Sequence, residues 1–427
     1  MPDDPKLALA VADGGRLRAT LLELWQRTRM DWGFVTDRLA ITFRKERWIG
    51  GHERRFISET LYGMVRNLRR IDLAIERARP TKQAPKDLDR LLVLLVLEGQ
   101  LDPQRLPEGL DRAAVLGVDQ VIAAERKPAR RIALGASFPD WLAEMFVADH
   151  GDRAEALARS LNERAPMTVR ANTLITTRDE LATALKAEKL ETHAGAHSDT
   201  ALIIDSRTNL FATKAFEAGA FEAQDEGSQL LAELATPSSA KPLVIDYCAG
   251  AGGKTLAIAA RLANRGRIIA TDIDDKKLEE LRRRARRGKV SNARALRVDD
   301  RELDQLHAKA DMVFVDAPCT GTGALRRNPE SRWRLRESEI AGFAKRQLEI
   351  VNTARGLLAP GGLLVYATCS VLAAENQRVA EQVPLTPVPL EELWPADRAE
   401  RLGDGEALAL TPDRHGTDGF YARVFRS

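Results

Sequence analysis

The chain has 427 residues, a net charge of +3, and 44% hydrophobic and 30% charged residues, which fits an ordinary soluble protein of about three domains or two large ones. Its longest apolar run, at 91–97, is too short to cross a bilayer, and the acidic segment 1–10 lacks the basic region of a signal peptide. Three cysteines without CxxC spacing and six scattered histidines argue against a disulfide framework and a zinc site, so we expect a reduced, cytoplasmic protein without a metal or a membrane contact.

Residues 1–150 are expected to form a helical domain. Three stretches, at 15–28, 54–78 and 88–101, carry apolar residues at the i, i+3, i+4 spacing of an amphipathic helix. Prolines between the stretches, such as Pro85, mark the turns that separate the helices.

Basic residues are concentrated in two parts of the chain. Lys and Arg outnumber Asp and Glu between Arg44 and Arg90, and a second basic cluster lies at 276–289. Along one polar stripe of the helical region we expect Arg66, Arg69 and Arg70. Clusters of this kind are either the footprint of a phosphate backbone or a solvated helix face, and the sequence leaves both interpretations open.

A small mixed α/β segment is expected at 151–240. The stretch 166–174 alternates like a strand, and a second strand is expected from Ala201. A helix should begin near Asp225, because acidic residues in a first turn interact favourably with the helix dipole. The stretch 236–242 contains two prolines and two serines and is a plausible joint.

Residues 241–427 alternate between strands and helices. The expected strands are 243–247, 267–271, 293–298, 311–316 and 362–368. The expected helices are 253–264, 275–288 and 338–357. Continuous apolar strands between amphipathic helices predict a doubly wound, mostly parallel sheet covered on both faces, with ligands bound beyond the carboxyl ends of its strands. The alternating tail 419–425 predicts a final antiparallel strand.

The stretch "DYCAGAGGKT" at 246–255 is a glycine-rich turn between the first strand and the first helix of that domain. A P-loop would need a glycine five residues before Gly253, and that position is Cys248, so the phosphate-binding pattern fails. The alternative ligand is a nucleoside cofactor, whose ribose needs a carboxylate at the end of the next strand. Asp272 supplies this carboxylate.

Carboxylates also follow the third and fourth strands. Asp299 and Asp300 come after the third strand, where an adenine amino group would lie, and Asp316 ends the fourth. Asp at a strand end is also a common helix cap, and for Asp299 alone both interpretations stay open.

All three cysteines lie at, or shortly after, the ends of apolar runs. Cys248, inside the glycine turn, fits a small buried hydrophobe. Cys319 and Cys369 instead follow two strands at the mouth of the expected site. A thiolate in that place can attack a polarised ring carbon, which is the work of an activated nucleophile.

The combination of these motifs closely resembles the Sun/RsmB-type RNA cytosine-5 methyltransferases, over about Val169 to Phe425. The motifs that carry the resemblance are "DYCAGAGGKT", "TDID", "VDD", "DAPCTGTG", "RRNPESRW" and "YATCSV". The resemblance implies a class I methyltransferase fold that uses S-adenosylmethionine. The helical start is similar to the NusB-like RNA-binding domain that some members carry.

The resemblance also assigns roles to individual residues. Cys369 would attack C6 of the target cytosine, Cys319 would assist breakdown of the adduct, and Asp316 would hold the base edge near N3 and lie near the methyl donor. The cofactor would be held by Cys248, Ala249, Gly250, Ala251, Gly252, Gly253, Lys254, Asp272, Asp299 and Asp316. Ala251 departs from the family, which usually has proline there; alanine can adopt a similar φ, so we expect the cofactor site to survive.

The resemblance implies RNA as the substrate. Because the target base must leave its stack, a single strand or a loop of that RNA is favoured. The resemblance favours ribosomal RNA, transfer RNA is the alternative, and a monomer is expected. Arg326, Arg327 and Trp333 would contact phosphate or stack on a base, although Trp333 is equally well explained as a core residue. A non-catalytic RNA-binding assembly factor is the second interpretation. A DNA methyltransferase is the third interpretation. It ranks last because such an enzyme would need a target-recognition region after the Pro-Cys motif, and the chain has no room for one.

Overall fold

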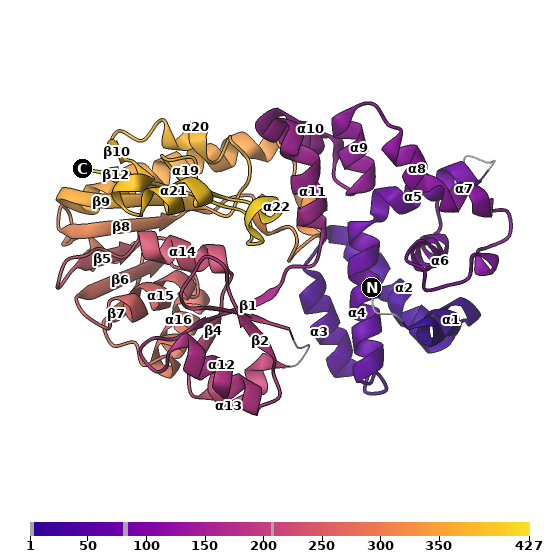
Figure 1. Cartoon of the computed structure of the whole chain (residues 1–427), viewed down its shortest axis with the longest axis horizontal. Helices are drawn as coiled ribbons and strands as arrows, with labels where there is room; N and C mark the ends of the chain where they lie inside the picture. Colours follow the sequence, from indigo (N-terminus) through magenta and orange to yellow (C-terminus); the bar gives the residue numbers. More distant parts are fainter. Residues whose placement is uncertain (1–3, 80–83, 206–208) are drawn as a thin grey trace. The chain divides into compact units, whose positions relative to one another are not determined.

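The computed structural model describes residues 4–79, 84–205 and 209–427, and it divides the chain into two compact units (Figure 1). One unit comprises Met1–Arg164 together with Leu325–Glu337, and the other comprises Ala165–Ala324 and Ser338–Ser427. The first unit therefore contains a short segment that is distant in sequence. The domain limits expected from the sequence did not include this segment.

The first unit is helical, as predicted. Its helices are α1 Pro5–Asp13, α2 Gly15–Asp31, α3 Val35–Lys45, α4 Gly51–Arg66, α5 Leu68–Ala78, α6 Asp87–Leu97, α7 Arg112–Leu116, α8 Val118–Ala123, α9 Pro128–Gly135, α10 Asp140–His150 and α11 Ala154–Asn162. Helix α6 is apolar on all sides and is buried from Asp89 to Val96, which is expected of a helix at the centre of a bundle. The predicted stretch 54–78 is broken at Asn67 into α4 and α5.

The arginines of the predicted basic stripe are bound within the unit. Arg69 donates to Asp140, with Nη1 to Oδ1 at 2.8 Å, and Arg70 pairs with both Glu98 and Asp119. Arg66 donates from Nη2 to the carbonyl oxygen of Arg326. These side chains hold neighbouring helices together, so this part of the basic cluster is structural.

The segment Leu325–Glu337 is anchored in the helical unit by a fully buried arginine. Arg332, in the short helix α18 (Ser331–Arg334), donates from Nη1 to the carbonyl oxygen of Ala136 and to Oδ1 of Asn162, both at 2.9 Å. Its guanidinium lies 4.1 Å from the ring centre of Phe138. Trp333 packs on Trp32 with ring centres 5.7 Å apart and lies partly buried against the helical core, which favours the core interpretation of this residue.

Replacing Arg332 with alanine is expected to lower the free energy of unfolding by about 2–4 kcal/mol, because it removes several buried hydrogen bonds and leaves their acceptors unpaired. Urea unfolding of the intact chain measures the change. Arg334→Ala is the matched control: this side chain is exposed and lies over Phe34, and its loss should cost less than about 1 kcal/mol. Equal losses for the two variants would show that Arg332 is not an anchor.

The second unit begins with a small antiparallel sheet of strand order β2-β3-β1-β4. Its strands are β1 Met167–Ala171, β2 Thr192–Ala194, β3 Ala201–Ile204 and β4 Phe221–Ala223, and the accompanying helices are α12 Arg178–Ala187, α13 Lys214–Glu217 and α14 Glu226–Leu234. The two predicted strands and the helix capped by Asp225 are confirmed. Strands β2 and β4 have only three residues each and were not predicted from the sequence.

The larger sheet of this unit has eight strands in the order β10-β12-β9-β8-β5-β6-β7, with β11 paired to β12. Its strands are β5 Leu243–Asp246, β6 Arg267–Asp272, β7 Ala293–Arg297, β8 Ala310–Asp316, β9 Leu358–Thr368, β10 Thr386–Val388, β11 Leu408–Leu410 and β12 Phe420–Arg426. Its helices are α15 Gly253–Arg261, α16 Asp275–Arg287, α17 Arg301–Asp304, α19 Ile340–Ala354, α20 Gln377–Ala380, α21 Ala396–Leu402 and α22 Pro412–His415. The five predicted parallel strands and the final antiparallel strand are confirmed.

Alternate residues of the central strands feed two separate cores, one on each face of the sheet. Phe314 and Val365 pack with α14 and α15, whereas Val315 and Tyr366 pack with α19. Strand β5 has β6 as its neighbour on one side and β8 on the other, so the strand order reverses at β5. This change of direction opens a crevice at the carboxyl ends of β5 and β8, where ligands bind in such sheets.

Among the helices of the described ranges, none has the length and apolarity needed to span a membrane.

Candidate active site

The glycine-rich turn joins β5 to α15 and requires glycine at two positions. Gly250 and Gly252 have φ values of +55° and +84°, which residues with a side chain rarely adopt. At Gly252 an added Cβ would lie 2.5 Å from Cγ of Leu281, so the turn lies directly against α16. At Gly250 an added Cβ would meet no atom within 4 Å.

This difference predicts unequal effects for two similar substitutions. Gly252→Ala combines an unfavourable φ, worth about 1–3 kcal/mol, with a clash against Leu281, and should weaken binding of S-adenosylmethionine at least about tenfold. Gly250→Ala has the unfavourable φ without the clash and should have a clearly smaller effect. Isothermal titration calorimetry measures both affinities. An equal loss for the two would mean that the contact with Leu281 does not shape the turn.

Asp272 ends β6 and faces the glycine turn. Its Oδ2 accepts a hydrogen bond from the backbone N–H of Gly250 at 2.9 Å, and its Oδ1 accepts one from Asp274 at the same distance. The next residue, Ile273, is 73% exposed, which is unusual for a large apolar side chain. A carboxylate with remaining acceptor capacity beside an apolar surface fits a ribose and its nucleobase.

The two acids after β7 are engaged in contacts of their own. Asp299 accepts from Arg297 at 2.9 Å, and this hydrogen bond lowers the pKa of the exposed Asp299 carboxyl group. Asp300 caps α17 by accepting from the backbone N–H of Glu302. The helix-cap interpretation thus holds for Asp300, and adenine recognition by Asp299 stays a prediction.

Lys254 and Asp316 connect the glycine turn to the end of β8. The Lys254 Nζ atom lies 2.6 Å from Oδ2 of Asp316, and the ammonium also lies 5.9 Å from the ring centre of Phe420. Burial by itself lowers the pKa of Lys254, but the charge and hydrogen bond of Asp316 outweigh burial, and the pKa is raised above its ordinary value. Lys254 is therefore a charged hydrogen-bond donor beside the Asp316 carboxylate.

Asp246, at the end of β5, was not predicted as a site residue. Its Oδ2 accepts from Oγ1 of Thr255 at 2.6 Å, whereas its Oδ1 is buried without a hydrogen-bond partner. Burial raises the pKa of Asp246 to about 7. Its place at a strand end, in front of the glycines, is the signal that would have identified it.

The structure brings the two predicted catalytic cysteines together. Cys319 lies three residues after β8, Cys369 directly follows β9, and their sulfur atoms are 3.3 Å apart. The hydrogen bond to Cys369 and, after it, burial raise the pKa of Cys319. The two sulfur atoms are within hydrogen-bond distance, and either of them can be the donor.

Cys248 lies in a different environment. It is partly buried against the apolar core on the α19 face of the sheet, and burial, followed by the charge of Asp316, raises its pKa. A thiol in this state is not an available nucleophile, which agrees with the interpretation of Cys248 as a small hydrophobe.

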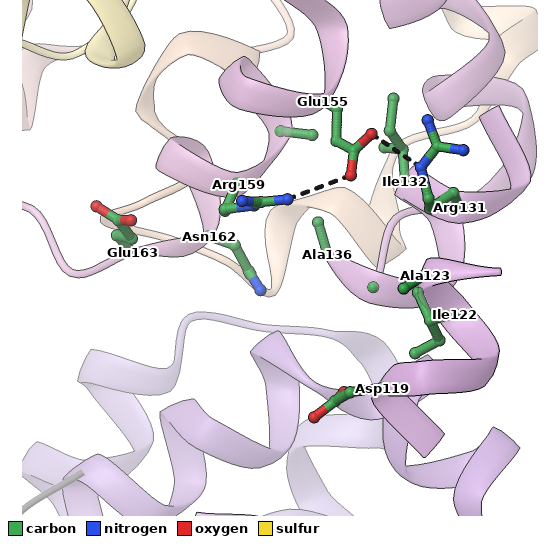
Figure 2. A pocket seen from close by; sticks show the side chains of 12 residues that line it. Asp119, Ile122, Ala123, Arg131, Ile132, Ala136, Glu155, Arg159, Asn162 and Glu163 are labelled. Carbon is green, nitrogen blue, oxygen red and sulfur yellow. Dashed lines mark hydrogen bonds and ion pairs between the residues drawn. The ribbon is translucent and has the colours of Figure 1, made fainter. Parts of the chain in front are cut away.

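A separate cavity of about 350 Å³ lies in the helical unit (Figure 2). Glu155 accepts hydrogen bonds there from Arg131 and Arg159, at 2.9 and 3.2 Å. None of the predicted catalytic residues lines this cavity. Throughout the ranges that the structure describes, no group of His, Cys, Asp and Glu side chains is arranged to hold a metal ion.

Comparisons with known proteins agree with this geometry. A family model described as 16S rRNA methyltransferase RsmB/F matches residues 234–426, and the ferredoxin-like domain of RsmF/B-like methyltransferases matches residues 138–210. The putative methyltransferase MT1451 of Mycobacterium tuberculosis is 31% identical over 425 residues, which cover 89% of this chain and 90% of that protein. The probable ribosomal RNA small subunit methyltransferase B of Synechocystis is 29% identical over 406 residues, covering 86% and 90% of the two chains.

The fold is also found in a solved structure. The crystal structure of PH0851 superimposes with a TM-score of 0.73 and 24% identity, and the match covers 100% of both chains. The glycine turn, Asp272 and the exposed Ile273 fit the nucleoside part of S-adenosylmethionine, and Lys254 lies near enough to Cys369 to interact with its charge. The chain therefore belongs to the RsmB/F family and is an RNA methyltransferase that takes its methyl group from S-adenosylmethionine.

Proposed function

We propose that this protein methylates C5 of a cytosine in RNA through a covalent bond between Cys369 and C6 of the base. The observation that carries the proposal is the 3.3 Å contact between Cys319 and Cys369, at the carboxyl ends of two neighbouring strands. A single buried cysteine needs no functional explanation, but two sulfur atoms within hydrogen-bond distance, one of which interacts with the charge of Lys254, have the arrangement of an activated nucleophile.

The chemistry follows from the weakness of C5 as a nucleophile. The Cys369 thiolate forms a bond to C6, and the electron pair of the C5–C6 double bond moves onto C5. Bound S-adenosylmethionine supplies the methyl group that C5 then accepts. Solvent water takes the proton from C5 as the C6–S bond breaks, which restores the C5–C6 double bond and returns the thiolate. The covalent bond thus divides one difficult step into easier ones.

Cys319 and Asp316 have supporting roles in this proposal. Cys319 keeps its proton while Cys369 attacks, and it assists the breakdown of the adduct afterwards. Asp316 holds the base edge near N3, and Lys254, at 2.6 Å, fixes the orientation of its carboxylate. Preorganised charges in a water-poor site stabilise developing charge more strongly than they would in water.

The proposed substrate is ribosomal RNA. The family model and the Synechocystis relative are both named for small-subunit ribosomal RNA, and transfer RNA is the alternative. The target base must be unstacked to reach the sulfur, which costs a few kcal/mol and favours a loop or a single strand. The three free cysteines fit a reaction in the reducing cytoplasm.

Bisulfite sequencing of total RNA from cells with and without the protein tests this proposal. The expected result is a cytosine in small-subunit ribosomal RNA that resists conversion only when the protein is present. Methylation of transfer RNA would change the proposed substrate. Binding to ribosomal RNA without any methyl transfer would instead identify a non-catalytic assembly factor.

A further inference from the structure

A fully buried carboxylate, Glu375, lies in the turn that follows β9 and accepts four hydrogen bonds. Its Oε1 accepts from the backbone N–H of Thr320 at 2.9 Å and from Nε2 of Gln347 at 3.0 Å. Its Oε2 accepts from Oγ1 of Thr320 at 2.5 Å and from Oγ of Ser370 at 2.6 Å. Because each oxygen of this buried carboxylate accepts two hydrogen bonds, the Glu375 side chain is held in one orientation.

The partners of Glu375 adjoin the two cysteines. Thr320 directly follows Cys319, and Ser370 directly follows Cys369. The carboxylate therefore joins two loops that are about fifty residues apart in sequence, in addition to the bond from the Gly323 N–H to the Cys369 carbonyl oxygen. In addition, Gln347 donates to the carbonyl oxygen of Pro318, the residue before Cys319, at 3.1 Å.

Glu375 is itself held in place from two directions. The hydroxyl group of Tyr366, on β9, donates to the Glu375 carbonyl oxygen at 2.5 Å. The neighbouring Asn376 accepts from Thr368 at 2.6 Å and donates to the Ser370 carbonyl oxygen at 2.9 Å. It is therefore hydrogen-bonded to the residues on both sides of Cys369.

We propose that Glu375 is the positioning residue that holds the Cys319 and Cys369 sulfurs in contact. It holds the two cysteine loops through its hydrogen bonds with Thr320 and Ser370. A shift of either loop would lengthen the 3.3 Å contact, and misplacement of reacting groups by about 1 Å can cost about 10²-fold in rate. The kinetic part of this inference rests on the proposed function, whereas the part that concerns the sulfur contact does not.

The first test measures the sulfur contact without RNA. In full-length protein carrying Cys248→Ser, the oxidant diamide converts the Cys319 and Cys369 thiols into a disulfide and is itself reduced to the hydrazine. The rate is followed by mass spectrometry. The rate of disulfide formation is divided by the rate at which iodoacetamide alkylates Cys369 at the same pH. This ratio separates a change in the thiolate fraction of Cys369 from a change in the distance between the two sulfurs.

Glu375→Ala is expected to slow disulfide formation at least about tenfold, because both loops lose their shared acceptor. Glu375→Gln should keep the rate within about threefold, since its amide oxygen can still accept from the Thr320 N–H and its amide nitrogen can donate to the two hydroxyl groups. Glu233→Gln is the matched control: this largely buried carboxylate on α14 pairs with Arg398, and its change should leave the rate unaltered.

The second test measures methyl transfer by Glu375 variants of the full-length protein that retains all three cysteines. Glu375→Ala should lower kcat about 10²-fold with an unchanged KM for S-adenosylmethionine, and Glu375→Gln should restore most of it. If the parent protein transfers no methyl group while disulfide formation still depends on Glu375, the proposed function fails and the positioning role stands.

The inference is overturned if Glu375→Ala forms the disulfide as fast as its parent. Should that variant fail to fold, as judged by circular dichroism, Thr320→Val serves in its place, because it removes one hydroxyl donor and keeps the side-chain shape. An intermediate rate for Thr320→Val supports the positioning role, and a parental rate contradicts it.

Discussion

Replacement of Cys369 by alanine is expected to abolish methyl transfer, with a loss of at least about 10³-fold in kcat. The sulfur that forms the bond to C6 is then missing, and C5 stays too weak a nucleophile to accept the methyl group. The measurement is transfer of tritiated methyl groups from S-adenosylmethionine to RNA. The binding of S-adenosylmethionine should be unchanged, because Cys369 lies at the end of β9 and the glycine turn follows β5.

Cys248→Ala is the matched control for this variant. Cys248 is partly buried against the core, and burial raises its pKa, so its thiol plays no part in the proposed attack. Retention of most of the activity is expected. An active Cys369→Ala protein would refute the assignment of the nucleophile.

Replacement of Cys319 by alanine is expected to trap the protein on its RNA. Cys369 alone forms the bond to C6, more slowly without the neighbouring thiol, whereas breakdown of the adduct depends on Cys319. The C6–S bond should therefore form and persist. With labelled RNA and S-adenosylmethionine, a slowly migrating protein–RNA species should accumulate on denaturing gels, and turnover should fall by about 10²-fold or more.

The double variant Cys319→Ala/Cys369→Ala is the control, and it should form no such species. If Cys369→Ala accumulates the adduct instead, the roles are exchanged, as in the DNA cytosine-5 methyltransferases, where the Pro-Cys cysteine attacks. The hydrogen bond with Cys369 and burial raise the pKa of the Cys319 thiol, which disfavours Cys319 as the attacking thiolate.

The central sheet could be predicted from sequence because its strands are buried on both faces. The runs 312–315 and 363–367 are continuously apolar, and the helix between these two strands has the 3.6-residue period of an amphipathic helix, so each element has a local signal. The three-residue strands β2 and β4 have no comparable signal, since they form only where β3 and β1 offer an edge.

The candidate site could be predicted where the chemistry needs a particular residue type at a strand end. Asp272, Asp316, Cys319 and Cys369 satisfy this condition, and the structure places them at the carboxyl edge of one sheet. Glu375 was missed because its function depends on Thr320 and Ser370, and no spacing in the sequence reveals that contact.

The segment Leu325–Glu337 shows the same limit on a larger scale. "RRNPESRW" reads as a basic, aromatic surface suited to RNA, yet Arg332 is fully buried and Trp333 packs against the helical core. A buried arginine is stable only where carbonyl oxygens and an aromatic ring surround it, and these come from residues about 170–200 positions earlier in the chain.

The most direct test of the covalent mechanism uses RNA that contains 5-fluorocytidine, whose C5 carries no proton, so that the adduct cannot break down after methyl transfer. The wild-type protein is incubated with this RNA and S-adenosylmethionine, digested with protease and nuclease, and analysed by mass spectrometry. We predict that the peptide with Cys369 carries one methylated fluorocytidine nucleotide. A nucleotide attached to the peptide with Cys319, or no attached nucleotide on either peptide, would contradict the account.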